Sequence, residues 1–270
     1  MPNPAGNYPG RQIFLGSTLE ENPAFVYVVT GRSDPSKGRY ASPYLSDQNA
    51  IRMRPIDPKE PFDQFRHYQA VMIDPETGLL VVSNSQAPVD AVSEHYKFVT
   101  DDEKLSDGFA QNMLSLIGPE YDSKDKPTSR IIGVSAPCSG SWMNILAITA
   151  EKGSAYSTVD TPSKHNALQP GTFRFVPTYS GNVDYKNFDA LKLKLDQTLF
   201  KTQETEAEAL VQAFYDLTDY TDDKYGDLRV CTIAGVRNGR GPQGDWQLKT
   251  KNRWNSLEEF QAYLRERGKE

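Results

Sequence analysis

The sequence predicts an α+β protein in which antiparallel sheets carry helices on their outer faces. Segments rich in Ile, Val, Phe and Tyr come in adjacent pairs joined by polar turns, which is the pattern of β-hairpins. Stretches with apolar residues at spacings of three and four follow, and more strand patterns come after them. Hairpins, then helices, then further strands are typical of α+β proteins.

Three hairpins and several single strands are predicted. The hairpins pair residues 12–15 with 25–30, 68–74 with 78–83, and 130–136 with 141–149. Further strands are expected at 51–54, 173–177 and 228–236, and residues 246–249 are expected to pair with the last of these.

Helices are predicted at 88–97, 105–116, part of 191–215, and 257–267. The last one has a capping box, with Ser256 as N-cap and Glu259 three residues on. The charged, Pro-containing stretch 121–129 is predicted to be a loop. We expect residues 1–270 to form one domain, in which the polar region around 181–226 is a divergent insertion.

Composition excludes several functional classes. The chain has 30 basic and 36 acidic residues and a net charge of −6, which argues against a general nucleic-acid or anionic-membrane surface. No apolar stretch approaches the length of about 20 residues that a membrane helix needs. The start, MPNPAGNYPG, lacks the basic and apolar regions of a signal peptide, and the two cysteines have no CxxC partners. We therefore expect a cytoplasmic protein with free thiols, and the scattered histidines predict no metal site.

Three arginines are expected at one edge of the first hairpin. Arg11 begins its first strand, and Arg32 follows its second strand. These two positions are neighbours in an antiparallel pair, and a Pro- and Gly-containing turn brings Arg39 back toward them. Two interpretations are open. In the first, each arginine pairs with a surface carboxylate. In the second, the three form an anion pocket, because the guanidinium fork matches phosphate and carboxylate oxygens.

Other polar residues stand where predicted strands and helices begin or end. Asn84 follows a buried strand and precedes a helix, a suitable place for a polar ligand or for an ordinary turn and N-cap. Tyr68 heads the second hairpin, where its hydroxyl either serves as an acid or lies in water. Glu120 and Asp122 follow Pro119, and either is a general base or a solvated surface carboxylate.

Nucleophilic catalysis has little support in the sequence. Cys138 lies in the small-residue turn APCSGS, and no residue nearby supplies a base. The patterns GxSxG and the Gly-rich phosphate loop are both absent.

Five stretches carry a resemblance to a known family. In order along the chain they are YPGRQIFLG, FVYVVTGRS, YQAVMI, LLVVSN and SRIIGVSA, all within about residues 8–150. Together they resemble the archaeal-type IMP cyclohydrolase family. The resemblance implies a four-layer αββα sandwich like that of the N-terminal-nucleophile hydrolases. No Cys, Ser or Thr heads the chain, so a self-processed nucleophile is not expected.

The resemblance also implies a reaction and a set of site residues. The reaction is ring closure of 5-formamidoimidazole-4-carboxamide ribonucleotide to IMP, with loss of water and without cofactor or metal. Matching positions imply catalytic roles for Arg39, Tyr68 and Glu120, with Asp122 as the alternative carboxylate. The implied substrate-binding residues are Arg11, Arg32, Gln69, Asn84 and Arg130. The family pattern has Asn where this chain has Gln69.

Two other functions are compatible with these residues. One is a non-catalytic protein that binds purine-pathway ribonucleotides through the arginine pocket. The other is an amide hydrolase on the same scaffold, for which Cys138 would be the nucleophile. The sequence leaves the oligomeric state open, a homo-oligomer included.

Overall fold

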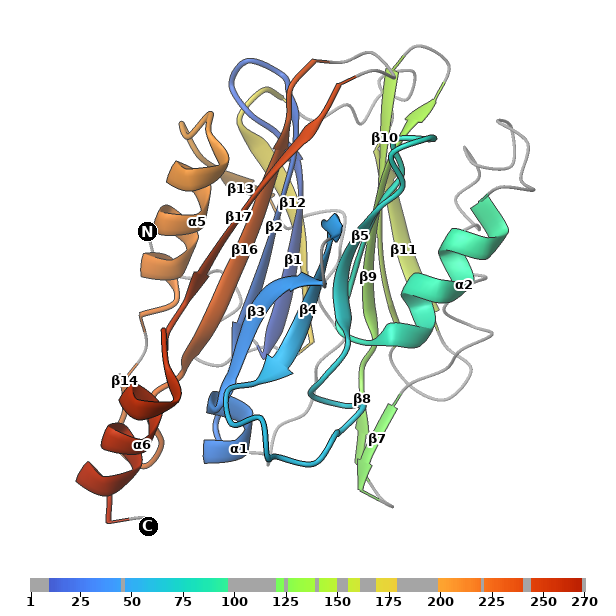
Figure 1. Ribbon diagram of the computed structural model, residues 1–270. Helices are drawn as coiled ribbons and strands as arrows, with labels where there is room; N and C mark the ends of the chain where they lie inside the picture. The colour runs from blue at the N-terminus through green and yellow to red at the C-terminus, as the bar shows by residue number, and fades with distance from the viewer. Residues whose placement is uncertain are drawn as a thin grey trace.

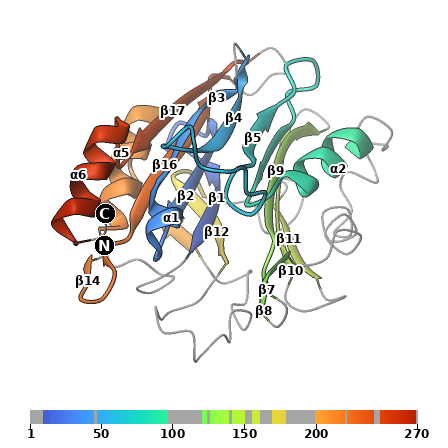
Figure 2. The same ribbon diagram turned by 60° about the horizontal axis from the view of Figure 1, so that its bottom comes forward.

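The computed structural model describes residues 10–44, 47–96, 120–123, 126–138, 141–149, 155–160, 169–178, 199–219, 221–239 and 244–268. Two large antiparallel sheets face each other, and helices cover their outer faces (Figure 1). Figure 2 shows α5 (Ala207–Leu217) and α6 (Leu257–Glu266) on one side of the sheets and α2 (Gln86–Tyr96) on the other. This arrangement confirms the predicted α+β class and its αββα layering.

The first sheet has six strands. In spatial order they are β13 (Leu199–Lys201), β12 (Thr172–Pro177), β1 (Arg11–Ser17), β2 (Pro23–Thr30), β16 (Arg229–Arg237) and β17 (Trp246–Asn252). The first predicted hairpin is confirmed, with Arg11 opposite Val29. The predicted pairing of the last two strands is confirmed as well.

The second sheet has seven strands. In spatial order they are β11 (Ala155–Asp160), β10 (Ser141–Thr149), β9 (Ile131–Cys138), β6 (Leu80–Ser83), β5 (Gln69–Ile73), β4 (Asp47–Pro55) and β3 (Arg39–Tyr44). It contains the second and third predicted hairpins, β5–β6 and β9–β10, which are both confirmed.

Three apolar clusters fill the spaces between the four layers. Strand β2 shows why its sequence is apolar without interruption. Phe25, Tyr27 and Val29 face the other sheet, while Val26 and Val28 face α5. Side chains alternate between the faces of a strand, so a strand covered on both sides needs apolar residues at every position.

The sheets approach each other closely where β9 crosses β1. A Cβ on Gly133 would lie 2.7 Å from Cγ2 of Ile13, which is closer than side chains can pack. Glycine at this position therefore sets the spacing between the sheets.

Some local predictions were wrong or incomplete. Residues 121–129 were expected to form a loop, but β7 (Glu120–Ser123) and β8 (Lys126–Thr128) form a small hairpin there. Proline is tolerated at 127 because a two-stranded ribbon has only edge strands. Strand β3 was not predicted, and the stretch 191–215 contains the short strand β13 before α5. The helix predicted at 105–116 lies outside the described residues.

The C-terminal helix follows its sequence signal. Ser256 accepts a hydrogen bond from the backbone N–H of Glu259 at 3.3 Å, as a capping residue does. The smaller elements are α1 (Asp34–Lys37), β14 (Thr221–Asp222) and β15 (Gly226–Asp227). In the part of the chain that the structure describes, none of the helices has the length and apolar character needed to span a membrane.

Candidate functional site

The strand register brings most of the predicted site residues to one end of the sandwich. In the second sheet, Arg39 starts β3 opposite Pro55, and Gln69 starts β5 opposite Arg52. Strand β6 ends beside β9, with Ser83 opposite Ile132. The members of the predicted set at this end of that sheet are Arg39, Tyr68, Gln69, Asn84 and Arg130.

The first sheet contributes Arg11 and, just past the end of β2, Arg32. The backbone N–H of Thr30 donates to Gly10 O at 2.7 Å, which closes this end of the hairpin. The Arg11 guanidinium donates to Phe65 O at 3.0 Å, so it reaches across to the segment that precedes Tyr68. That Arg11, Arg32 and Arg39 hold one anion stays a prediction.

Arg39 is the most unusual side chain of this end. It is 1% exposed, and its Nε donates to Ser36 O at 2.7 Å. Its Nη1 is buried and has no hydrogen-bond partner among the described residues, and none of their carboxylates forms an ion pair with it. Burial and the positive charge of Arg11 lower the Arg39 pKa. The guanidinium therefore carries a buried charge that an anion would compensate.

Two tyrosines share a hydrogen bond beside Arg39. The hydroxyls of Tyr27 and Tyr68 are 2.7 Å apart, and both side chains are buried. One hydroxyl donates to the other, so one phenolic proton remains for a third partner. Burial and the neighbouring Tyr68 raise the Tyr27 pKa well above its ordinary value, which keeps Tyr27 protonated at neutral pH.

His67 adds a second buried donor. Its Nδ1 accepts a hydrogen bond from the backbone N–H of Asp63 at 3.0 Å, so the neutral ring carries its proton on Nε2. Nε2 is buried and has no hydrogen-bond partner among the described residues. Burial lowers the His67 pKa, and the charges of Arg66 and Arg39 act in the same direction. We call Arg11, Tyr27, Arg39, His67 and Tyr68 the Arg39 site.

Hydrogen bonds hold Asn84, Arg130 and Gln69 in place. The Asn84 side chain donates to Ser129 O at 2.8 Å and accepts from the Ile131 N–H at 3.0 Å. It thereby fixes both neighbours of Arg130, whose Nη1 donates to Ser85 Oγ at 3.2 Å. The Gln69 N–H donates to the Gln86 side chain at 3.0 Å.

The two candidate carboxylates differ in their place on β7. Glu120 pairs with Thr128, close in sequence to Ser129 and Arg130, whereas the register shifts at Asp122 between Tyr121 and Ser123. The backbone thus brings Glu120 nearer to the Arg130 segment. The positions of the two side chains lie outside what the structure describes.

The thiols are poorly suited to nucleophilic catalysis. Burial raises the pKa of Cys231 to about 12, and its Sγ contacts Met53 Sδ at 3.7 Å. A protonated thiol in an apolar setting is a weak nucleophile. Cys138 is the last residue of β9. Along an extended strand it lies about 23 Å from Ile131, the residue next to Arg130 in the candidate site. Within the described ranges, His, Cys, Asp and Glu form no group of three that would hold a metal.

Tyr27 and His67 were not identified as site residues from the sequence. Tyr27 stands mid-strand in an apolar run, where a tyrosine is typical of a core. His67 adjoins Tyr68, but adjacency alone gives no information about burial or hydrogen bonding. The signal for Tyr27 is a long-range one, since it arises from the contact of β2 with Tyr68 just before β5. The ring of His67 is oriented by the local Asp63 N–H, but its burial depends on the fold around it.

Comparison with known proteins identifies the family. Among curated proteins, none matches the chain. One family model does match: it describes IMP cyclohydrolase-like proteins and covers residues 8–240. The match includes every predicted site residue and well over half of the sequence, so this chain belongs to the IMP cyclohydrolase-like family.

Proposed function

We propose that the protein catalyses ring closure of 5-formamidoimidazole-4-carboxamide ribonucleotide to IMP, a step of purine biosynthesis. The proposal goes beyond the family match, which supports an IMP cyclohydrolase-like protein without specifying its reaction. It agrees with the chemistry of the Arg39 site, where hydrogen-bond donors and positive charge predominate.

The observation that carries the proposal is the buried guanidinium of Arg39, which no carboxylate of the described residues compensates. Removing a charge from water costs several kcal/mol unless a partner of opposite charge replaces the lost solvation. Arg11 makes this cost larger, because it adds a second positive charge. A ribonucleotide supplies the missing negative charge through its phosphate, and the reacting groups supply more as the ring closes.

The reaction joins two groups of one molecule. The carboxamide nitrogen attacks the formyl carbon, a C–N bond forms, and the formyl oxygen leaves as water. That water takes one proton from the carboxamide nitrogen and one from the formamido nitrogen. The enzyme has to hold the planar conformer and move these protons, and the balance requires no cofactor or metal.

Each site residue has a role in this scheme. Tyr68 donates a proton to the formyl oxygen, assisted by Tyr27, and Glu120 takes the proton from the carboxamide nitrogen. Arg39 stabilises the negative charge that develops on the formyl oxygen. Arg11 and Arg32 bind the phosphate, Gln69 and Arg130 contact the base or ribose, and Asn84 holds the Arg130 segment. The Nε2–H of His67 is a further donor for a substrate oxygen.

The test is formation of IMP by the purified full chain with chelator present. We expect turnover with the formamido ribonucleotide and no dependence on added metal. If the protein forms no IMP but IMP raises its melting temperature, it is a silent binding protein. If IMP neither forms nor stabilises the protein, the proposed function is wrong.

A further inference from the structure

The chain beyond the family match contacts both sides of Arg39. Strand β17 and helix α6 both lie after residue 240, where the match ends. Asn252 donates to Ala41 O at 2.9 Å and accepts from the Ala41 N–H at 2.8 Å. On the other side of Arg39, the Trp254 indole donates to Lys37 O at 3.1 Å.

Phe260 of α6 packs directly on Gly38. A Cβ on Gly38 would lie 2.7 Å from the Phe260 ring, so the aromatic ring occupies the place of a side chain. The φ of Gly38 is −76°, which any residue adopts. Glycine is therefore required here by the close approach of α6 and not by the backbone conformation.

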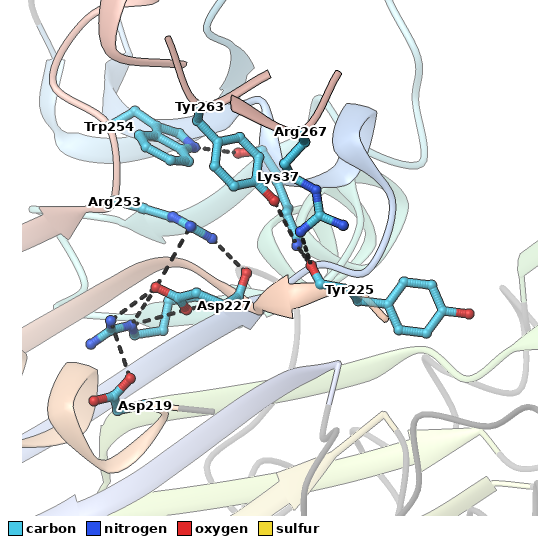
Figure 3. Close-up of polar contacts among 9 residues, drawn as sticks. Lys37, Asp219, Tyr225, Asp227, Arg253, Trp254, Tyr263 and Arg267 are labelled. Atoms are coloured by element: carbon cyan, nitrogen blue, oxygen red, sulfur yellow. Dashed lines mark hydrogen bonds and ion pairs between the residues drawn. The ribbon is translucent and has the colours of Figure 1, made fainter. Parts of the chain in front are cut away.

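The Lys37 side chain ties α1 to the same segment (Figure 3). Its Nζ donates to Tyr225 O and to the Tyr263 hydroxyl, the latter at 3.1 Å. Arg267 of the C-terminal segment donates to the same Tyr225 carbonyl at 3.2 Å. The Tyr225 carbonyl thus accepts hydrogen bonds from Lys37, which precedes Gly38, and from Arg267, which follows α6.

Arg253 holds this arrangement together. Its guanidinium donates to Asp227 O at 2.5 Å and lies 3.7 Å from the Asp227 carboxylate. It also stacks on Trp254, with 4.3 Å from Cζ to the ring centroid, and on Tyr263, at 4.8 Å. Cations and donors here are matched by carbonyls, carboxylates and aromatic faces, which makes this a scaffold and not a second anion site.

We propose that the C-terminal segment, residues 252–268, is a positioning element that sets where the Arg39 guanidinium lies. Among the described residues, the Arg39 side chain has one hydrogen bond, to Ser36 O, and that carbonyl belongs to α1. The place of the guanidinium therefore depends on the backbone from Ser36 to Ala41. Trp254, Phe260 and Asn252 hold that backbone at Lys37, Gly38 and Ala41.

A steric variant and its rescue test the proposal. Gly38→Ala places a methyl group against the Phe260 ring, and α1 must move unless the ring does. A displacement of about 1 Å at a catalytic group costs about a hundredfold in rate, so we expect kcat for IMP formation to fall between 10- and 100-fold. Phe260→Leu in the Gly38→Ala background makes room for the methyl group and should restore most of kcat. Failure of this rescue would overturn the proposal.

Two comparisons separate positioning from loss of stability. Leu248→Ala lies on β17, where Leu248 packs on Gly235 away from α1, so it should lower the melting temperature and leave kcat within about twofold. In an Arg39→Ala background, Gly38→Ala should have almost no further effect on kcat. Additive losses in this double-mutant cycle would show that the segment does not act through Arg39.

The kinetic readouts rest on the proposed function, so a readout without substrate is also needed. Trp254→Phe keeps an aromatic ring against Phe260 and Tyr263 but removes the donor to Lys37 O. We expect amide hydrogen exchange across residues 34–41 to accelerate at least tenfold, with β9 unchanged. Equal exchange in both proteins refutes the positioning element. Absence of IMP formation by the wild type refutes the proposed function and leaves this exchange result valid.

Discussion

Two regions of the molecule gather arginines, and they differ in how the positive charge is balanced. The Arg39 site contains Arg11 and Arg39, and Arg39 forms no ion pair with a carboxylate of the described chain. The second region, which we call the Arg253 cluster, contains Lys37, Asp227, Arg253 and Tyr263, which Figure 3 labels, together with Arg229, which pairs with Asp227. There, Arg229 pairs with Asp227 at 2.9 Å and with Asp219 at 3.2 Å.

The pKa of Asp227 and the pKa of Arg39 show the same contrast. In the Arg253 cluster burial alone would raise the Asp227 pKa, but hydrogen bonds from Arg229 lower it below its ordinary value. In the Arg39 site, burial and Arg11 lower the pKa of an arginine. We infer that the paired carboxylate of Asp227 belongs to the fixed framework and that the buried charge of Arg39 is the place for a ligand. Counting arginines in the sequence does not distinguish the two regions.

The largest effect is expected at the tyrosine pair. If Tyr68 is the acid, Tyr68→Phe should lower kcat by roughly 10²–10⁴, the contribution of a positioned proton donor. Tyr27→Phe is the matched control, since it removes the same hydrogen bond but leaves the Tyr68 hydroxyl, and kcat should stay within about tenfold of wild type. Steady-state kinetics decide, and equal losses in both variants would remove the special role of Tyr68.

Arg39→Met should separate activity from stability. Loss of one preorganised group that stabilises developing charge costs about 10²–10³ in kcat. The free energy of unfolding should stay equal or rise, because an uncompensated buried charge is removed along with one hydrogen bond of about 1 kcal/mol. Denaturant titration gives the stability. A variant with normal kcat and a large loss of stability would show that Arg39 is structural.

Arg229→Met tests the other side of the comparison. It leaves Asp227 with fewer partners, so the free energy of unfolding should fall by about 1–3 kcal/mol. The kcat of the folded protein should change little, because Arg229 lies in the framework. Stability that is unchanged, together with a large drop in kcat, would contradict the division into framework and site.

The smallest expected effect is the pH dependence that Lys37 gives to the free energy of unfolding. Burial, together with Arg253 and Arg267, lowers the Lys37 pKa from 10.5 to about 8, against the opposing influence of Asp34 and Asp227. Between these two values the unfolded chain holds one more proton than the folded chain, so the contribution of Lys37 to the free energy of unfolding rises with pH. Below pH 8 the contribution is constant and unfavourable.

Lys37→Met removes this titration. The difference in unfolding free energy, wild type minus variant, should therefore increase from about pH 8 to 10.5. Denaturant titrations at several pH values measure it. A difference that stays flat or falls over this range would mean that the folded protein does not depress the Lys37 pKa.

The hairpins could be predicted from sequence because their information is local. Alternation and turn residues define β1–β2, β5–β6 and β9–β10, and antiparallel geometry then places Arg11 and Arg32 at one end. The β7–β8 hairpin was missed because charge and Pro127 are typical of loops. Strand β3 was missed because its residues, RYASPY, lack an apolar run.

The candidate site was predictable in part for the same reason. Tyr68 could be placed at the head of the second hairpin, just before β5. Arg39 could be placed by the Pro- and Gly-containing turn before it, although β3 itself was missed. The burial of Arg39, the lack of a partner for its Nη1 among the described residues, and the contact of the Tyr27 hydroxyl with Tyr68 depend on how the two sheets pack. Contacts between residues far apart in the chain leave no periodic pattern, so a single sequence gives no signal for them.

The hydrogen bonds of Asn252 also bear on solubility. Strand β3 is the edge of the seven-stranded sheet, and an exposed edge is a template for strand addition and aggregation. The Asn252 amide occupies both the N–H and the C=O of Ala41, as a neighbouring peptide unit would, and Pro43 has no N–H to offer. The strand thus has fewer open sites for another chain. In Asn252→Ala, light scattering should show more concentration-dependent association, and unchanged scattering would mean that Pro43 or other features already protect this edge.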